Sequence, residues 1–158
     1  MADYRPNTLV VIFIVHGFVT AHPGPVDNKK QLKNMLFIAI DDLCTQLGTY
    51  GHDFVKSPNI DALASRSIVF ERAYCQVAVC SPSRTFLLTG RRSDNNRVWK
   101  IANDEYWRDY TNATIIPQYF KENGYVSVGM GKIFHLGAQN GNDVMDYSWS
   151  LPYYHSPL

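Results

Sequence analysis

Two short stretches of the sequence carry residues suited to binding ions or to nucleophilic catalysis. The first is Asp41-Asp42, which directly follows the apolar run Met35–Ile40. Neighbouring carboxylates repel each other, and a divalent cation bound between them relieves that repulsion. Oxygen ligands of this kind suit Ca²⁺ or Mg²⁺, so the pair is a candidate metal site. The alternative is that one of the aspartates caps a helix or lies in an exposed turn.

The second stretch is CSPSRTFLLTGRR, which runs from Cys80 to Arg92. Ser81 and Pro82 are typical of a helix cap and a first helical position, which predicts a helix whose N-terminus points at Cys80. Such an end favours anions, and Arg84 adds a charged donor about one turn later. Cys80 is therefore either an activated nucleophile or a structural thiol at the start of a helix.

The segments around these residues predict an α/β fold. The apolar run before Asp41 is typical of a strand buried on both faces of a parallel sheet, and such sheets bind ligands beyond the carboxyl ends of their strands. Residues 57–68 carry apolar side chains at helical spacing, with the helix expected to start near Pro58. Because residues 68–70 resemble a second strand, we expect a βαβ unit here.

A second strand–helix pattern lies later in the chain. Apolar residues at helical spacing, with Pro117 near the start, predict a helix that ends at Asn123-Gly124. Residues 126–130 then read as a strand that delivers Lys132 and His135 to the same edge as Asp41. Considered without Cys80, Lys132 is better explained as a solvated lysine and His135 as a satisfied core histidine.

Composition limits the class of protein. The 158 residues are 46% hydrophobic and 13% aromatic, which is enough for a packed core. Fifteen basic residues face 14 acidic ones, so a nucleic-acid partner is not expected. The three cysteines, Cys44, Cys75 and Cys80, form neither a CxxC pair nor an even disulfide framework.

The N-terminal segment suggests a secretory route. Residues 1–21 fit a signal peptide, with an apolar centre at 9–15 and small residues at its end, whereas the run is too short to span a bilayer. The alternative for the apolar centre is a buried strand. Residues 22–33 read as a linker. Asn112-Ala113-Thr114 is the one N-x-S/T glycosylation acceptor in the sequence, which suits the same route.

The cysteine stretch resembles a specific family signature. Cys80-Ser81-Pro82-Ser83-Arg84, followed by Leu88-Thr89-Gly90-Arg91, is similar to the C-x-P-S-R…L-T-G-R pattern of type I sulfatases. The segment Gly124–His135 resembles a second element of that family, which contains a Gly-Lys pair and a later histidine. The resemblance extends over about residues 34–152.

The resemblance implies both a fold and a set of roles. It implies an alkaline-phosphatase/sulfatase-like mixed sheet sandwiched by helices, incomplete at the C-terminus, with residues 34–158 as the N-terminal portion of a catalytic domain. Cys80 would be oxidised by the formylglycine-generating enzyme to formylglycine, whose hydrate is the nucleophile. One Ca²⁺ would be held by Asp41, Asp42 and the modified Cys80. Arg84 would stabilise the modified residue, Lys132 the sulfate charge, and His135 would handle a hydroxyl proton.

The same resemblance implies a substrate and a compartment. A sulfatase of this type acts on sulfated glycosaminoglycan oligosaccharides in the lysosome, or outside the cell if secreted. Because sulfatases are several times longer and draw further calcium and sulfate ligands from later segments, we expect this chain alone to have little activity. The alternatives are a non-catalytic truncated remnant and a phosphate or phosphonate ester hydrolase of the same superfamily.

Overall fold

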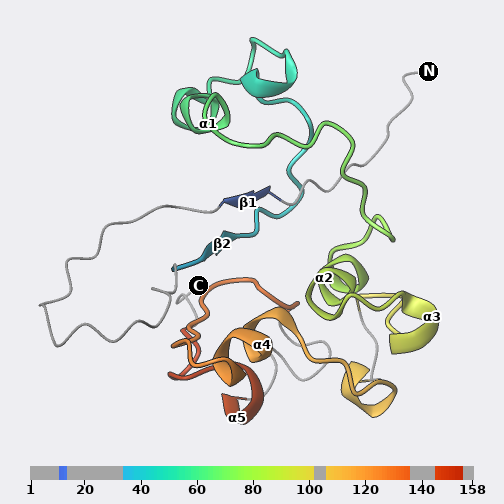
Figure 1. The fold of residues 1–158 in the computed structure, drawn as a ribbon. Helices are drawn as coiled ribbons and strands as arrows, with labels where there is room; N and C mark the ends of the chain where they lie inside the picture. Colours follow the sequence, from blue (N-terminus) through green and yellow to red (C-terminus); the bar gives the residue numbers. More distant parts are fainter. Residues whose placement is uncertain (1–10, 14–33, 102–105, 136–144, 155–158) are drawn as a thin grey trace, which may run out of the picture. The chain divides into compact units, whose positions relative to one another are not determined.

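The computed structural model describes residues 11–13, 34–101, 106–135 and 145–154 (Figure 1). In these ranges the chain forms short helices and a two-stranded sheet, and it divides into two compact units. One unit contains Asp41–Thr45 and the described residues from Arg72 onward. The other contains the described residues of Val10–Ile40 and Gln46–Glu71.

The sheet of the second unit differs from the sequence-based expectation. Strand β1 (Val11–Phe13) pairs with β2 (Leu36–Ile38) in antiparallel fashion, with Ile12 opposite Phe37. Leu36 is 52% exposed and Ile38 43% exposed, so the prediction of a parallel strand buried on both faces is wrong for this structure. An apolar run fixes neither the direction nor the number of its neighbours, because pairing depends on distant segments.

Strand β1 bears on the prediction of a signal peptide at residues 1–21. Val11–Phe13 form a strand, which was the alternative to the apolar centre of a signal peptide. The remainder of 1–21 and the whole linker 22–33 lie outside the described residues, so the signal peptide and the linker stay predictions. No helix in the described ranges is long and apolar enough to cross a membrane.

Helix α1 (Pro58–Ala64) begins where its sequence predicts. Pro58 occupies the first helical position, where its missing N–H costs no hydrogen bond. Asp61 fixes the helix to the 3-10 helix η1 (Gly48–Tyr50), since its Oδ1 accepts the backbone N–H of Thr49 at 2.8 Å. The Ser57 hydroxyl also donates to this carboxylate, at 3.1 Å.

The predicted βαβ unit is not formed. Helix α1 ends at Ala64, and residues 68–70 are not a strand: Ile68 is 82% exposed and Phe70 66% exposed. Three apolar residues in a row cannot make a strand without a partner, and the described chain offers them none.

The first unit is helical and contains the core. Its elements are α2 (Cys80–Thr89), α3 (Ser93–Asn96), the 3-10 helix η2 (Trp107–Asp109), α4 (Ile116–Glu122) and α5 (Met145–Ser148). The buried apolar cluster comprises Leu88, Val98, Trp107, Ala113, Ile115 and Phe134. Trp107 and Phe134 stack with ring centroids 6.2 Å apart. Since Phe134 follows Lys132 by two residues, this stacking anchors the loop that carries Lys132.

Helix α4 confirms the prediction for residues 116–122. Pro117 lies in the first turn, and the helix stops before Gly124, which has φ = 86°. The N–H of Tyr125 donates back to the carbonyl of Phe120 at 3.0 Å, which closes the helix end. Positive φ is the conformation that glycine adopts without a steric penalty, so the Asn-Gly stop signal has a direct structural cause.

The predicted strand at 126–130 is wrong as an element of a sheet. Its side chains do alternate, with Val126, Val128 and Met130 exposed and Ser127 buried. Its backbone pairs instead with the C-terminal segment, defined here as residues 149–154: the N–H of Ser150 donates to Ser127 at 2.7 Å, and Met130 and Tyr154 form a single parallel bridge. The mixed sheet sandwiched by helices is thus not present in the described residues.

Candidate functional site

Helix α2 positions the cysteine and the arginine of the signature. The helix begins at Cys80, where the carbonyl of Val79 accepts the N–H of Ser83 at 3.0 Å. The predicted cap at Ser81 and first helical position at Pro82 therefore lie two residues too late, since the cap is Val79 and the helix begins at Cys80. Proline is tolerated throughout the first helical turn because those N–H groups have no partner within the helix.

Cys80 and Arg84 share one face of α2. They are four residues apart, which places their side chains one turn apart on the same side. Cys80 is partly buried and is a free thiol, as are Cys44 and Cys75. Arg84 is only 7% exposed, so its charge needs partners within the protein.

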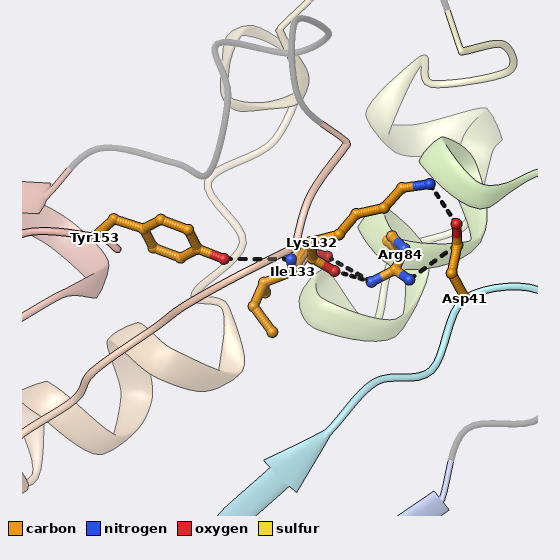
Figure 2. A network of polar contacts seen from close by, with 5 residues as sticks. All are labelled: Asp41, Arg84, Lys132, Ile133 and Tyr153. Atoms are coloured by element: carbon orange, nitrogen blue, oxygen red, sulfur yellow. Dashed lines mark hydrogen bonds and ion pairs between the residues drawn. The ribbon is translucent and has the colours of Figure 1, made fainter. Parts of the chain in front are cut away.

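Arg84 finds those partners in two distant segments (Figure 2). Its Nη2 donates to Oδ1 of Asp41 at 3.0 Å, and its Nη1 donates to the backbone carbonyls of Lys132 and Ile133. The planar guanidinium suits this task, because its fork of N–H groups reaches several acceptors at once. Arg84 thus connects α2 to the Asp41 turn and to the loop that carries Lys132.

Lys132 completes an ion-pair network around Asp41. Its Nζ lies 2.5 Å from Oδ2 of Asp41, so each carboxylate oxygen faces a positive charge. Burial of Asp41 raises its pKa, but the hydrogen bonds and positive charges of Lys132 and Arg84 outweigh that effect and hold the pKa below its usual 3.8. Lys132 keeps 34% of its side chain exposed, whereas Arg84 is buried.

The other predicted site residues lie beside this network in the sequence. Asp42 is exposed and has φ = 49°, a left-handed conformation that aspartate tolerates in turns. His135 is partly buried and follows the fully buried Phe134. The structure therefore brings Asp41, Arg84 and Lys132 into contact. It leaves the roles assigned to Asp42, His135 and Cys80 as predictions.

The described residues do not form a calcium site by themselves. Both oxygens of Asp41 are engaged by Arg84 and Lys132, so a dication would compete with these two cations for the carboxylate. Across the described ranges, no group of three or more His, Cys, Asp or Glu side chains is placed to hold a metal ion. Calcium takes about six to eight oxygen ligands, which the present donor set does not supply.

Tyr153 is a member of the network that the sequence did not reveal. Its hydroxyl donates to the carbonyl of Gly131 at 2.7 Å and accepts the N–H of Ile133 at 3.3 Å. Burial raises its pKa above the usual 10.0. Because Tyr153 is about twenty residues from these partners and belongs to an aromatic-rich segment, neither motif nor spacing distinguishes it from a core residue.

The predicted glycosylation site lies on the surface. Asn112 is exposed, whereas the neighbouring Ala113 is 6% exposed and Ile115 fully buried. Thr114, the third residue of the acceptor triplet, is exposed as well. The buried neighbours fix the backbone, so the asparagine side chain is presented to solvent.

The sulfatase family model matches residues 33–156, and the chain belongs to this family. The family is one of sulfuric ester hydrolases with an alkaline-phosphatase/sulfatase-like α/β fold.

Individual relatives narrow the comparison. The chain is 52% identical over 124 residues to iduronate 2-sulfatase of Mus musculus and to that of Homo sapiens, a match that covers 77% of this chain and 22% of each relative. It is 36% identical over 118 residues to N-acetylgalactosamine-6-sulfatase of Canis lupus familiaris, covering 68% of this chain and 22% of that protein. The chain thus spans about a fifth of the length of these curated relatives.

Proposed function

We propose that this chain is part of a sulfuric ester hydrolase that, like iduronate 2-sulfatase, removes the 2-O-sulfate from iduronate units of heparan and dermatan sulfate. The observation that carries the proposal is the convergence of Lys132 and Arg84 on Asp41, with Cys80 on the same face of α2 as Arg84. The similarity to the two iduronate 2-sulfatases supports the choice of substrate.

The charges of the network suit sulfate transfer. The reaction spreads negative charge over the sulfate oxygens, and fixed positive groups stabilise that charge. The ammonium group of Lys132, whose side chain is partly exposed, binds a sulfate oxygen, while the buried Arg84 holds Asp41 and the Lys132 loop in place. Asp41 orients both cations, because each of its oxygens accepts a hydrogen bond from one of them.

Two further residues have proposed chemical roles. Oxidation of Cys80 to formylglycine would supply an aldehyde hydrate oxygen as the nucleophile toward the sulfate ester. His135 would hold or accept a hydroxyl proton close to that position, because an imidazole changes its protonation near neutral pH. In the complete family domain, Asp41, Asp42 and the modified Cys80 would furnish part of a calcium ligand set, and the remaining ligands would come from elsewhere.

The proposal includes a maturation route. Conversion of Cys80 requires the formylglycine-generating enzyme, which acts in the secretory pathway. A signal peptide at 1–21 and a glycan on Asn112 would both be consistent with passage through that pathway. The mature protein would then act in the lysosome, or outside the cell. The partner is a sulfated glycosaminoglycan oligosaccharide.

Peptide mass measurement on Cys80 tests the nucleophile. After secretory expression together with the formylglycine-generating enzyme, we expect the Cys80 peptide to lose its sulfur and gain a carbonyl. Cys75, also a partly buried free thiol, is the internal control and should stay unmodified. An unmodified Cys80 under these conditions excludes the aldehyde mechanism for this chain.

Sulfate release tests the reaction. We expect no measurable turnover of an iduronate 2-sulfate disaccharide by residues 22–158 alone, because the charge network lacks the rest of a sulfatase domain. Robust turnover would contradict the expected inactivity of this chain, and it would support the proposed hydrolysis of iduronate 2-sulfate. Faster cleavage of a matched phosphate or phosphonate ester would favour the alternative hydrolase of the same superfamily.

A further inference from the structure

The peptide groups on either side of Lys132 are held from two directions. Arg84 donates to the carbonyls of Lys132 and Ile133. Tyr153 accepts the N–H of Ile133 at 3.3 Å and donates to the carbonyl of Gly131 at 2.7 Å. In Figure 2, Tyr153 and Arg84 approach this loop from opposite sides. The backbone that carries the ammonium group is therefore clamped between a guanidinium and a phenol.

The ring of Tyr153 has little freedom to move. A Cβ atom on Gly129 would lie 2.6 Å from Cε2 of Tyr153 and 2.6 Å from the ring of Trp149, so both rings pack directly on the glycine backbone. The two rings meet edge to face with centroids 5.2 Å apart. The backbone of Tyr154 also pairs with the loop, since its N–H donates to Gly129 at 3.2 Å and its carbonyl accepts the N–H of Gly131 at 3.1 Å.

This packing aims one hydroxyl at the loop. Tyr153 is partly buried, and its hydroxyl both donates and accepts, so the bonds to Gly131 and Ile133 use both of its hydrogen-bonding functions. A lysine side chain is a flexible four-carbon stem, and it loses rotamer entropy when its ammonium group is fixed. Because the backbone is fixed on both sides of Lys132, its ammonium group can reach fewer positions.

We propose that the hydroxyl of Tyr153 is a positioning group that fixes the Lys132 loop and thereby holds the Lys132 ammonium group against Asp41. The role rests on the proposed function, in which Lys132 binds a sulfate oxygen. A displacement of about 1 Å at such a group can cost on the order of a hundredfold in rate, so its precision matters for sulfate transfer. Tyr153 acts through Lys132 and is not itself a group that touches the substrate.

The test is the chemical reactivity of the Lys132 amine, which does not depend on turnover. Tyr153→Phe removes the hydroxyl and keeps the ring, and Tyr154→Phe is the matched control on an exposed neighbour. Each variant is acetylated with an N-hydroxysuccinimide ester at fixed pH, and the rate at each lysine is measured by peptide mass spectrometry. We expect Lys132 to react about three- to tenfold faster in Tyr153→Phe, because a loosened loop frees the ammonium group from Asp41. Lys100, which is exposed, should not change in either variant.

Two results would overturn the positioning role. An unchanged Lys132 rate in Tyr153→Phe means that the hydroxyl does not hold the loop. An equal rise at Lys56, whose Nζ donates to the carbonyl of Asp53 at 2.6 Å in the other compact unit, means that the hydroxyl supports the fold as a whole and not this loop. If Tyr153→Phe does not fold, amide hydrogen exchange of the unmodified chain decides: Ile133 should be protected by its bond to Tyr153, and exchange at the unprotected rate contradicts the proposal.

Acetylation in the presence of inorganic sulfate distinguishes the positioning role of Tyr153 from the proposed sulfate-binding role of Lys132. Inorganic sulfate should slow the acetylation of Lys132 in the unmodified chain more than sodium chloride of equal ionic strength does. Lack of protection by sulfate, together with the expected effect of Tyr153→Phe, counts against the sulfate-binding role and leaves the positioning role supported.

Discussion

Nζ of Lys132 lies 2.5 Å from Oδ2 of Asp41, although the two residues are 91 positions apart in the sequence. The same carboxylate accepts a bond from Arg84 through its other oxygen, at 3.0 Å. One aspartate thus brings a surface turn, a helix and a loop to a common point.

The Asp41–Lys132 pair should show a small but measurable coupling. Both side chains are more than a third exposed, at 39% and 34%, so solvent screens their attraction. We expect a double-mutant cycle with Asp41→Asn and Lys132→Met to give about 0.5–1 kcal/mol in urea unfolding, decreasing with added salt. The control is the more exposed pair Arg92–Asp94, at 3.8 Å, whose coupling should be near zero. Equal couplings at the two pairs would contradict the prediction.

Replacement of Arg84 by lysine should be far from conservative. A single ammonium group cannot serve the Asp41 carboxylate and two backbone carbonyls together, and Arg84 is 7% exposed, so water does not compensate. We expect Arg84→Lys to lower the free energy of unfolding by about 2 kcal/mol in chemical denaturation. The exposed Arg91 is the control, and Arg91→Lys should change the free energy of unfolding by less than about 0.5 kcal/mol. Similar losses in both variants would argue against the network.

Tyr153 should make stability fall at alkaline pH. Burial raises its pKa above 10.0, with smaller opposing effects from the Ile133 bond and the Arg84 charge. Because the folded pKa exceeds the unfolded one, the stabilisation is fully present below about pH 10 and is lost as the pH rises through the folded pKa. We expect the decline in free energy of unfolding above pH 10 to be shallower in Tyr153→Phe than in the unmodified chain. A decline of equal slope would exclude this contribution.

Calcium should not stabilise this chain on its own. Both Asp41 oxygens already face cations, and the described residues hold no cluster of three acidic, His or Cys ligands. A site with a dissociation constant of about 10 μM would add about 2.7 kcal/mol at about 1 mM Ca²⁺. We expect a melting-temperature shift below about 1 °C at that concentration, compared with the chain in chelator. A larger shift would mean that the chain carries a complete ligand set.

Asn112 should receive a glycan if the chain enters the secretory pathway. The acceptor triplet is exposed at both Asn112 and Thr114, so an oligosaccharide meets no steric barrier there. Secretory expression should give a mass increase that a glycosidase removes and that Asn112→Gln abolishes. Asn95→Gln, at an exposed asparagine outside any acceptor triplet, is the control and should leave the glycan in place. An unglycosylated secreted chain would contradict the prediction.

The sequence determined the features that depend on neighbouring residues. Helices near Pro58 and Pro117 were predictable because proline and the following apolar spacing act within one or two turns. The stop at Gly124 was predictable because positive φ favours glycine. The signature around Cys80 likewise identified the family from adjacent residues, which the match over residues 33–156 confirms.

Only the tertiary structure decided which distant groups meet. The strands predicted at 68–70 and 126–130 failed because a strand exists through its partners, and local sequence does not specify them. The meeting of Asp41 with Arg84 and Lys132, and the clamp that Tyr153 forms on the loop, depend on how segments far apart in the chain pack together. Residue types and spacing therefore identified Arg84 and Lys132 as candidate charged groups. Packing determined that they share the carboxylate of Asp41 and that the hydroxyl of Tyr153 holds the Lys132 loop.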